Sequence, residues 1–382
     1  MNSPQALGKE TDMSNDTISL EEIKSALSSS DALWKAEETI LSSLSFEEKK
    51  FYLGAQPPPS EPSVEEIEKR VSLTKESLKA EALNTIGVPT AYDLRNVDNL
   101  NFVTAVKDQK QCRSCVAFGT IATVESSLLV QQRNDPRLNL EVDLSEAHLF
   151  FCHAGSPCSG GWWPPSAYDA FKNKGVVDEA CYKYDVGLER QDCNGMCADP
   201  NNHVVKIIGY TDLTGKPVQI KEWIFSKGPV SACLLVYEDF YSYRSGIYKH
   251  VTGQSLGAHC VTIIGYNDDH GYWICKNSWG QEWGEQGFFR IAYGEYGIDY
   301  YSNHGVDCGV TVPDWETKEE VERGDDMGVS TPNAESIGLQ VEYNFLQHEP
   351  GFAHEDIVQI EPAPGSLLSK GSTVRVFVNL EG

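Results

Sequence analysis

The sequence lacks the long hydrophobic runs of a membrane protein. No stretch of the 382 residues approaches the roughly 18 consecutive apolar residues that a membrane span needs. The first 20 residues contain no apolar core of signal-peptide length. Internal repeats and low-complexity tracts are also absent. An apolar fraction of 40% is that of a globular protein, neither disordered nor fibrous.

Positive charge is scarce, and cysteine is abundant. Lys and Arg number 31 against 56 Asp and Glu, so the formal charge is −25. That charge repels phosphate backbones and anionic surfaces, so neither nucleic acid nor a membrane is expected as the main partner. Eleven cysteines favour an extracellular or other oxidising compartment. No signal peptide is visible, however, and the localisation stays open.

A change of composition near residue 88 divides the chain. Before it, helices are predicted at Thr17–Ser30, Ser45–Leu53 and Ser63–Leu83. Ser45 and Glu48 form a capping-box pattern at the start of the second helix. The helical hairpin over residues 1–87 carries few apolar residues, so it needs a partner surface to stay folded.

Residues 88–313 are rich in Cys, Trp and Gly. They open with a long apolar helix predicted over Cys115–Gln132. The predicted strands are Val204–Tyr210, Val230–Val236, His259–Tyr266, Tyr272–Lys276 and Gly287–Tyr293. A helix followed by several strands indicates an α+β fold. Acidic residues 314–328 are interpreted as a linker, and residues 329–382 as a small terminal domain.

Four short motifs carry the candidate chemistry. They are Gln109-x-x-Cys112-x-x-Cys115, Cys158-Ser-Gly-Gly161, Gly257-Ala-His259 and Lys276-Asn-Ser-Trp-Gly280. A thiol nucleophile at the start of a helix gains thiolate character from the first-turn N–H groups. Histidine is the natural base, and asparagine orients the imidazole without competing for its proton. A glutamine amide supplies an N–H for the oxyanion that forms when a carbonyl is attacked.

The order Cys, His, Asn resembles the papain and cathepsin family of cysteine proteases. His259 lies 259 − 115 = 144 residues beyond Cys115, and Asn277 lies 277 − 259 = 18 residues further. Both separations suit the family, and the resemblance covers roughly residues 88 to 312. It implies a two-lobed fold, one lobe helical and one β-barrel-like, and peptide hydrolysis through an acyl-enzyme. No cofactor or metal is implied.

The resemblance also implies roles for individual residues. Gln109 would donate to the oxyanion, and Cys115, His259 and Asn277 would form the triad, shielded from water by Trp279. The remaining substrate-binding candidates are Gly160, Gly161, Trp162, Trp163, Pro164, Cys233 and Ala258. The apolar members of this set predict an apolar substrate residue two positions before the scissile bond.

Disulfides are implied for six cysteines. The family resemblance implies a bridge between Cys112 and Cys158 and a second between Cys152 and either Cys193 or Cys197. Cys181 would then pair with whichever of Cys193 and Cys197 remains. A zinc site from Cys181, Cys193 and Cys197 is the alternative. Cys308 matches a bridging position whose usual partner is missing. Cys233, Cys260 and Cys275 are interpreted as small buried hydrophobic residues, and Glu125 is interpreted as a structural residue.

Two residues beside the nucleophile depart from the family pattern. Arg113 stands where the family usually has Gly, and Val116 where it has an aromatic residue. The Gly position borders the pocket for the residue just before the scissile bond. Arg113 is therefore expected to narrow that pocket or favour an acidic side chain, unless it points to solvent. Val116 leaves less aromatic cover over the site.

The two ends of the chain add further expectations. The N-terminal segment sits where a propeptide sits in this family, so it is expected to lie in the cleft, with a permanent accessory hairpin as the alternative. Residues 329–382 resemble a PASTA module through Gln359-Ile-Glu-Pro-Ala-Pro-Gly365 and Lys370-Gly-Ser-Thr-Val374. Some PASTA modules contact the cell envelope. A recognition protein without catalysis, a cell-wall amidase and a transglutaminase are the rival functions.

Overall fold

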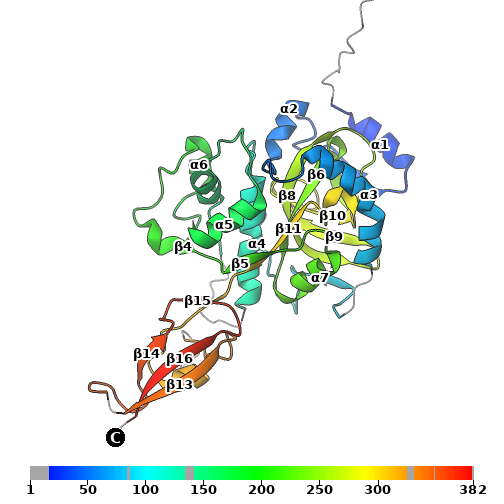
Figure 1. Cartoon of the computed structure of the whole chain (residues 1–382). Coiled ribbons are helices and arrows are strands. Elements are labelled where there is room, and N and C mark those ends of the chain that lie inside the picture. The colour runs from blue at the N-terminus through cyan, green and yellow to red at the C-terminus, as the bar shows by residue number, and fades with distance from the viewer. Residues whose placement is uncertain (1–16, 84–86, 134–141, 325–330, 348, 381–382) are drawn as a thin grey trace, which may run out of the picture.

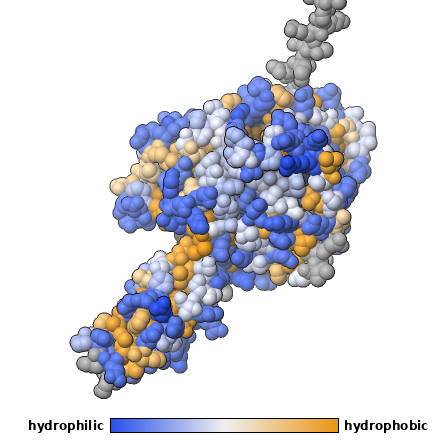
Figure 2. Space-filling model, in the orientation of Figure 1, coloured by the Kyte–Doolittle hydropathy of each residue, from blue (hydrophilic) through white to orange (hydrophobic). Residues whose placement is uncertain are grey.

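The computed structural model describes residues 17–83, 87–133, 142–324, 331–347 and 349–380. Figure 1 shows a helical lobe and a sheet lobe side by side, with the N-terminal segment lying across them. A smaller C-terminal unit projects from the base of the two lobes. On the face drawn in Figure 2, apolar residues gather along the neck between this unit and the lobes, and on the unit itself.

The helical lobe is built around one helix that is buried on all sides. Its elements are α4 (Cys115–Gln131), η2 (His148–Ala154), α5 (Pro164–Asn173), β3 (Val176–Val177), α6 (Tyr184–Arg190), η3 (Pro200–His203) and β4 (Val204–Val205). Nearly every residue of α4 is buried, as its apolar sequence predicts, because its two sides pack against different lobes. The first residue of this helix, Cys115, therefore lies between them.

The sheet lobe holds nine strands, ordered β1-β7-β10-β9-β8-β6-β11-β5, with β2 paired to β8. Its elements from residues 88–313 are β2 (Ala91–Asp93), β5 (Gly209–Asp212), α7 (Pro217–Ser226), β6 (Val230–Tyr237), η4 (Glu238–Ser242), β7 (Tyr243–Tyr248), β8 (Ser255–Asn267), β9 (Tyr272–Lys276), β10 (Phe288–Ala292), η5 (Glu295–Gly297) and β11 (Ser302–Asp307). β6 is buried along its whole length, which explains its unbroken apolar sequence.

The prediction of one continuous strand over Val204–Tyr210 is wrong. The run Val204–Tyr210 is divided between β4, which pairs with β3 in the helical lobe, and β5, which pairs with β11 in the sheet lobe. The chain changes partners at residues 206–208, so no single ladder can include the whole run. The other four predicted strands correspond to β6, β8, β9 and β10.

The N-terminal segment contains α1 (Leu20–Ser28), β1 (Leu33–Ala36), α2 (Phe46–Lys49), η1 (Lys50–Tyr52) and α3 (Val64–Ala82). The predicted capping box of Ser45 and Glu48 is present. β1 was not expected: it is four residues long and becomes a strand by pairing with β7. A strand this short shows too little alternation to be recognised in the sequence.

The lobes supply the surface that this segment lacks. The indole of Trp34 donates to the Lys249 carbonyl oxygen at 2.7 Å and lies 5.2 Å from the Tyr248 ring. On α3, Lys75 pairs at 2.5 Å with Glu295, whose side chain is 3% exposed. The partner surface that the helices were expected to need is therefore supplied by the sheet lobe.

The described part of the C-terminal unit contains a three-stranded sheet, a two-stranded sheet and one helix. Its elements are β12 (Val310–Thr311), α8 (Lys318–Arg323), β13 (Gln340–Gln347), β14 (Ile357–Glu361), β15 (Leu367–Leu368) and β16 (Thr373–Leu380). β16 lies between a parallel β13 and an antiparallel β14. The likeness to a PASTA module stays a prediction.

The described part of the predicted linker is ordered structure. Trp315 is 2% exposed and packs among Val321, Ile337 and Val376, and α8 follows it. Because β12 pairs with β15, the core of this unit begins within the stretch assigned from sequence to the peptidase. In the described part of this stretch Asp314, Glu316 and Glu319 are exposed while Trp315 and Val321 are buried, so an acidic composition does not make it a linker.

Replacing Trp315 should loosen the C-terminal unit alone. Trp315→Ala removes a buried ring whose Nε1 donates to the Pro332 carbonyl oxygen at 2.9 Å, at an expected cost of about 3–5 kcal/mol. Hydrogen exchange of the β13 and β16 amides measures the loss. Phe345→Ala, at a ring that is 52% exposed, is the control and should change stability by about 0.5 kcal/mol or less. Equal protection in both variants would contradict the assignment of Trp315 to this core.

Candidate active site

Cys115 begins α4 at the boundary between the lobes and is completely buried. The preceding residue, Ser114, is the N-cap, and its hydroxyl shares a 2.8 Å hydrogen bond with Tyr184. Tyr184 also donates to the main-chain oxygen of Gln109 at 2.9 Å. The turn before the helix is thus fixed to the helical lobe, and the sulfur faces the sheet lobe.

His259 and Asn277 come from adjacent strands of the sheet lobe. His259 lies in β8, and its Nε2 is 2.7 Å from Oδ1 of Asn277, which directly follows β9. Trp279 covers this pair, with its ring 4.8 Å from the imidazole, and is completely buried. Asn277 engages Nε2, and the other ring nitrogen, Nδ1, has no hydrogen-bond partner of good geometry among the residues that the structure describes.

Gln109 reaches the site from the loop before Cys115. Its Oε1 accepts a 2.7 Å hydrogen bond from Ser278, which orients the amide so that its NH₂ group faces the opposite way. The Nε2 donates to the carbonyl oxygens of Cys112 at 2.8 Å and of Tyr52 at 3.2 Å. The Tyr52 carbonyl oxygen, which belongs to the N-terminal segment, thus already accepts a hydrogen bond from Nε2 of Gln109.

The N-terminal segment passes directly over the thiol. The main-chain N–H of Gly54 donates to Sγ of Cys115 at 3.1 Å. The next N–H groups bind both walls of the cleft: Ala55 donates to Ala258 at 3.1 Å and Gln56 to Trp162 at 2.9 Å. Trp162 in turn donates to the Gly54 oxygen at 2.9 Å. These contacts are made through the main chain, as a bound peptide would make them.

The predicted pocket residues are brought together around Ala55. Trp163, Cys233 and Ala258 belong with Ala55 to one buried cluster. Gly161 lies where a Cβ would come 2.6 Å from the Gly54 oxygen, and Gly160 lies in the turn before it, packed against Ser156. Trp279 lies apart from this cluster, over the imidazole. Pro164 begins α5 beside Trp163.

Tyr301 is the pocket residue that sequence reasoning missed. It belongs to the same cluster, is 6% exposed, and its ring lies 5.8 Å from that of Trp163. Its buried hydroxyl makes no hydrogen bond within the described residues. Tyr301 lies just before β11 in a sequence with no distinguishing motif, so only the closure of the sheet brings it to the cleft.

Burial sets the protonation states of the Cys115 thiol and the His259 imidazole. Desolvation raises the pKa of the Cys115 thiol to about 12, although N–H groups, including that of Gly54, oppose the rise. Burial lowers the pKa of His259 to about 4, against the opposing effect of Asn277. At neutral pH the pair is a neutral thiol beside a neutral imidazole. The first-turn N–H groups were expected to favour thiolate, but with the cleft covered desolvation outweighs them.

A buried ionic network lies behind the site. Glu125, assigned from sequence to a structural role, accepts hydrogen bonds from Thr104 at 2.6 Å and Lys107 at 3.2 Å. Lys276, which precedes Asn277, donates to the same Thr104 hydroxyl at 3.0 Å. The network ties α4, the Gln109 loop and the end of β9 to one another, and therefore holds the parts of the site in register.

The cysteines implied as disulfides are joined in three pairs: Cys112–Cys158, Cys152–Cys193 and Cys181–Cys197. The first links the loop before Cys115 to the glycine loop within the helical lobe, where both cysteines belong to one core cluster. Cys308 is a free buried thiol, as are Cys233, Cys260 and Cys275.

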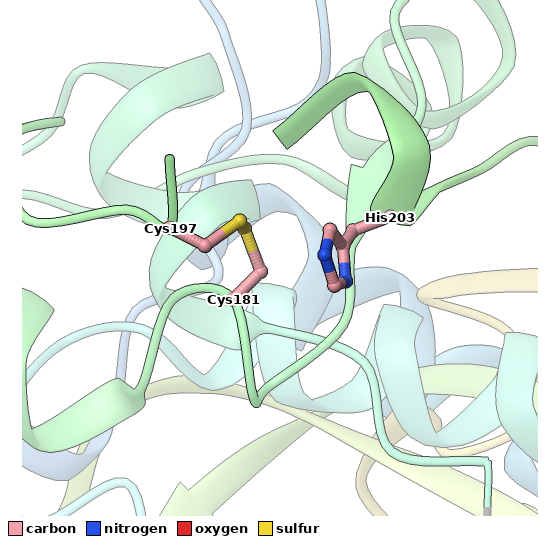
Figure 3. Close-up of side chains that lie close together, drawn as sticks. All are labelled: Cys181, Cys197 and His203. Carbon is pink, nitrogen blue, oxygen red and sulfur yellow. A yellow bond between two sulfur atoms is a disulfide. The ribbon is translucent and has the colours of Figure 1, made fainter. Parts of the chain in front are cut away.

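Figure 3 shows His203 beside the Cys181–Cys197 bridge. Within the described part of the chain, these three residues form the group with metal-ligand proximity. The two sulfurs are bonded to each other, however, and Nδ1 of His203 lies 2.6 Å from Asp178. The zinc alternative from Cys181, Cys193 and Cys197 is therefore wrong for this structure, which has all three in disulfides.

A two-lobed fold with a covered thiol between its lobes defines the class of protein. The model of the papain family of cysteine proteases matches residues 88–310, more than half of the chain. The chain therefore belongs to the papain family, and it is a cysteine peptidase. No described helix is long and apolar enough to cross a membrane.

The relatives are cathepsin B-like. The chain is 33% identical to cathepsin B-like CP2 of Giardia intestinalis over 54% of this chain and 70% of that protein. It is 30% identical to cathepsin B-like cysteine proteinase 4 of Caenorhabditis elegans over 65% and 86%. In fold it is similar to proCathepsin B S9 of Trypanosoma congolense, with a TM-score of 0.59, 21% identity, and 76% and 97% of the two chains covered. The precursor form of that neighbour fits an N-terminal segment lying in the cleft.

The covered thiol should be almost unreactive in the intact chain. Because the pKa of Cys115 is raised to about 12, the thiolate fraction and the rate of alkylation by iodoacetamide should rise about tenfold per pH unit between about pH 6 and about pH 9. Removal of the segment should raise the neutral-pH rate by about 100-fold or more. Mass spectrometry of the Cys115 peptide measures both rates, with Cys275→Ala as a control. A fast, pH-independent reaction of the intact chain would contradict the effect assigned to burial.

Proposed function

We propose that this peptidase hydrolyses peptide bonds with Cys115 as nucleophile, His259 as base, Asn277 as the residue that orients His259, and Gln109 as oxyanion donor. The observation that carries the proposal is the 2.7 Å contact of His259 with Asn277 beside a thiol whose sulfur already accepts an N–H from peptide main chain. Each group comes from a different part of the chain, and the N-terminal segment contacts two of them, Cys115 and Gln109.

In the open enzyme, His259 takes the thiol proton through Nδ1, and the sulfur attacks the substrate carbonyl carbon. The developing oxyanion accepts from Nε2 of Gln109, which now donates to the Tyr52 oxygen. The imidazolium then protonates the leaving amine, and a thioester to Cys115 remains. Water attacks the thioester with His259 again as base, releasing the acid and restoring the thiol.

The Asn277 carboxamide has a positional role. Its Oδ1 accepts from Nε2 of His259 and also from the Ser278 N–H at 2.8 Å, so the imidazole is held with Nδ1 free. A carboxylate at this position would compete for the proton, whereas an amide does not. Trp279 excludes water from this hydrogen bond and keeps the local dielectric constant low.

The pocket around Ala55 is proposed to select an apolar residue two positions before the scissile bond. Trp163, Cys233 and Ala258 offer only apolar surface. Tyr301 closes the same cluster, so we expect a small or medium side chain to fit better than a large aromatic one. Comparing Ala, Val, Leu and Phe at this substrate position in the wild type and in Tyr301→Ala tests the size limit.

The N-terminal segment is proposed to keep the enzyme latent. What faces the sulfur is an N–H donor of Gly54, not a carbonyl carbon, so the bound segment offers no electrophile. Only glycine fits at this crossing, because a Cβ on Gly54 would lie 1.9 Å from the Arg113 oxygen. Cleavage between about Leu83 and Tyr92 is the expected activation step, and retention of the segment in an active enzyme would favour the accessory-hairpin alternative.

Removing each proposed catalytic group should have a graded effect. Cys115→Ala should abolish hydrolysis of a fluorogenic peptide and labelling by an epoxide inhibitor. Gln109→Ala should lower kcat about 100- to 1,000-fold, with labelling of the thiol retained. Cys275→Ala, also at a buried thiol, should have wild-type activity. Full activity in Cys115→Ala would refute the proposal and favour another hydrolase site. No activity in a folded wild type from which the N-terminal segment has been removed would favour the recognition protein.

Adding one methyl group at Gly54 should release latency. In Gly54→Ala the Cβ collides with the Arg113 main chain, so the segment must leave the sulfur. We expect the full chain, without any cleavage, to hydrolyse peptides at least about tenfold faster than the uncleaved wild type. Gly209→Ala, where the added Cβ meets nothing within 4 Å, is the matched control. An inactive Gly54→Ala chain that is folded by circular dichroism would count against this mode of inhibition.

A further inference from the structure

One hydroxyl group holds both ends of the loop that joins the proposed oxyanion donor to the nucleophile. Tyr184, the first residue of α6, donates its hydroxyl proton to the Gln109 main-chain oxygen at 2.9 Å. Because that hydroxyl has a single proton, the Ser114 hydroxyl, 2.8 Å away, donates to it. Gln109 begins this loop, and Ser114 ends it directly before Cys115. A side chain from outside the loop therefore constrains the distance between its two ends.

The same loop contains a strained residue. Lys110 has a φ of 54°, in the left-handed region that a residue with a Cβ seldom adopts. The Cys112 N–H turns back and donates to the Lys110 oxygen at 2.8 Å. The ammonium of Lys110 pairs with Asp185 at 2.5 Å, but these side chains are 49% and 77% exposed, so the pair contributes little. Since such strain persists only where the surroundings over-determine the backbone, a buried constraint is needed.

The Tyr184 hydroxyl supplies that constraint, and the helical lobe fixes its position. Tyr184 is 7% exposed, and both Gln109 and Ser114 are completely buried. Its ring packs edge-on against that of Phe118 in α4, with the centroids 4.8 Å apart. Its main-chain N–H donates to Oε1 of Glu179 at 2.7 Å. The hydroxyl is thus placed by contacts outside the loop, and water cannot easily replace its buried hydrogen bonds.

We propose that Tyr184 is a positioning residue whose hydroxyl fixes the spacing between the Gln109 amide and the Cys115 sulfur. This rests on the proposed function, which assigns those two residues their roles. Ser278 of the sheet lobe orients the Gln109 side chain, and Tyr184 of the helical lobe holds the Gln109 main chain. The donor is therefore fixed from both lobes. An error of about 1 Å in such a spacing is enough to lower a rate about 100-fold.

The test uses the opened enzyme, because the intact chain is latent. The full chain is folded with its N-terminal segment in place, and limited proteolysis between about Leu83 and Tyr92 then removes the segment. Alkylation of the Cys115 peptide, followed by mass spectrometry, counts the open thiols. Rates are expressed per open thiol, so incomplete removal of the segment and loss of folded protein in a variant do not enter the comparison.

Tyr184→Phe removes the hydroxyl and keeps the packing of the ring. We expect kcat per open thiol to fall about tenfold, with KM within about twofold of the wild type, because the lost hydrogen bonds act on the oxyanion and not on substrate binding. Tyr182→Phe is the matched control. It removes a hydroxyl of the same lobe that donates to the Asp192 main-chain oxygen, and it should keep the wild-type kcat.

Two comparisons separate positioning from a loss of stability. In a Gln109→Ala background the oxyanion donor is absent, so adding Tyr184→Phe should lower kcat by less than about twofold, and the two effects are not additive. Alkylation by iodoacetamide displaces iodide and forms no oxyanion. Its rate at Cys115 in the opened Tyr184→Phe enzyme should stay within about twofold of the wild type.

Three outcomes overturn the role of Tyr184 while leaving the proposed function in place. They are an unchanged kcat in Tyr184→Phe, a tenfold loss that persists in Gln109→Ala, and a fall in alkylation as large as the fall in hydrolysis. A different outcome refutes the proposed function itself: an opened, folded wild type whose Cys115 is alkylated but which hydrolyses no peptide. That result also removes the oxyanion that the positioning of Gln109 serves.

Discussion

The contact between the Gly54 N–H and the sulfur of Cys115 is the interaction on which the rest of this structure depends. It places the main chain of the N-terminal segment in the cleft and takes the thiol out of water. The same passage directs Ala55 into the apolar pocket and the Tyr52 oxygen onto Gln109. Each feature that a substrate would use is engaged, yet the atom presented to the nucleophile is a hydrogen-bond donor.

Burial also accounts for the chemical state of the site. A thiolate–imidazolium pair needs solvent or fixed dipoles to offset desolvation, and in the covered cleft desolvation is the largest effect on both Cys115 and His259. Both groups are thus uncharged in the covered state. Gln109 and His259 are held by Ser278 and Asn277, which belong to the sheet lobe and not to the N-terminal segment.

A candidate site could be proposed from the sequence wherever a residue belongs to a motif. Cys115, His259, Asn277 and Gln109 each stand at a fixed offset in a recognisable local pattern; the structure brings His259 to Asn277 and Gln109 to Ser278, and the catalytic roles stay a proposal. Tyr301 and β1 were missed for the opposite reason: the first reaches the cleft through closure of a sheet, and the second becomes a strand only by pairing with β7. The prediction that residues 314–328 form a linker was wrong in the part that the structure describes. It rested on net charge, which reflects the exposed side chains and not the buried Trp315.

The C-terminal unit is attached at the far end of the helix that carries the nucleophile. α4 has 17 residues, or about 25 Å of helix at about 1.5 Å per residue, and Cys115 is its first. Beyond its last residue, Gln132 donates to the Gly309 oxygen at 2.9 Å, just before β12. The unit therefore projects from the base of the lobes (Figure 1). Its attachment lies at the opposite end of α4 from Cys115, the residue that the N-terminal segment covers.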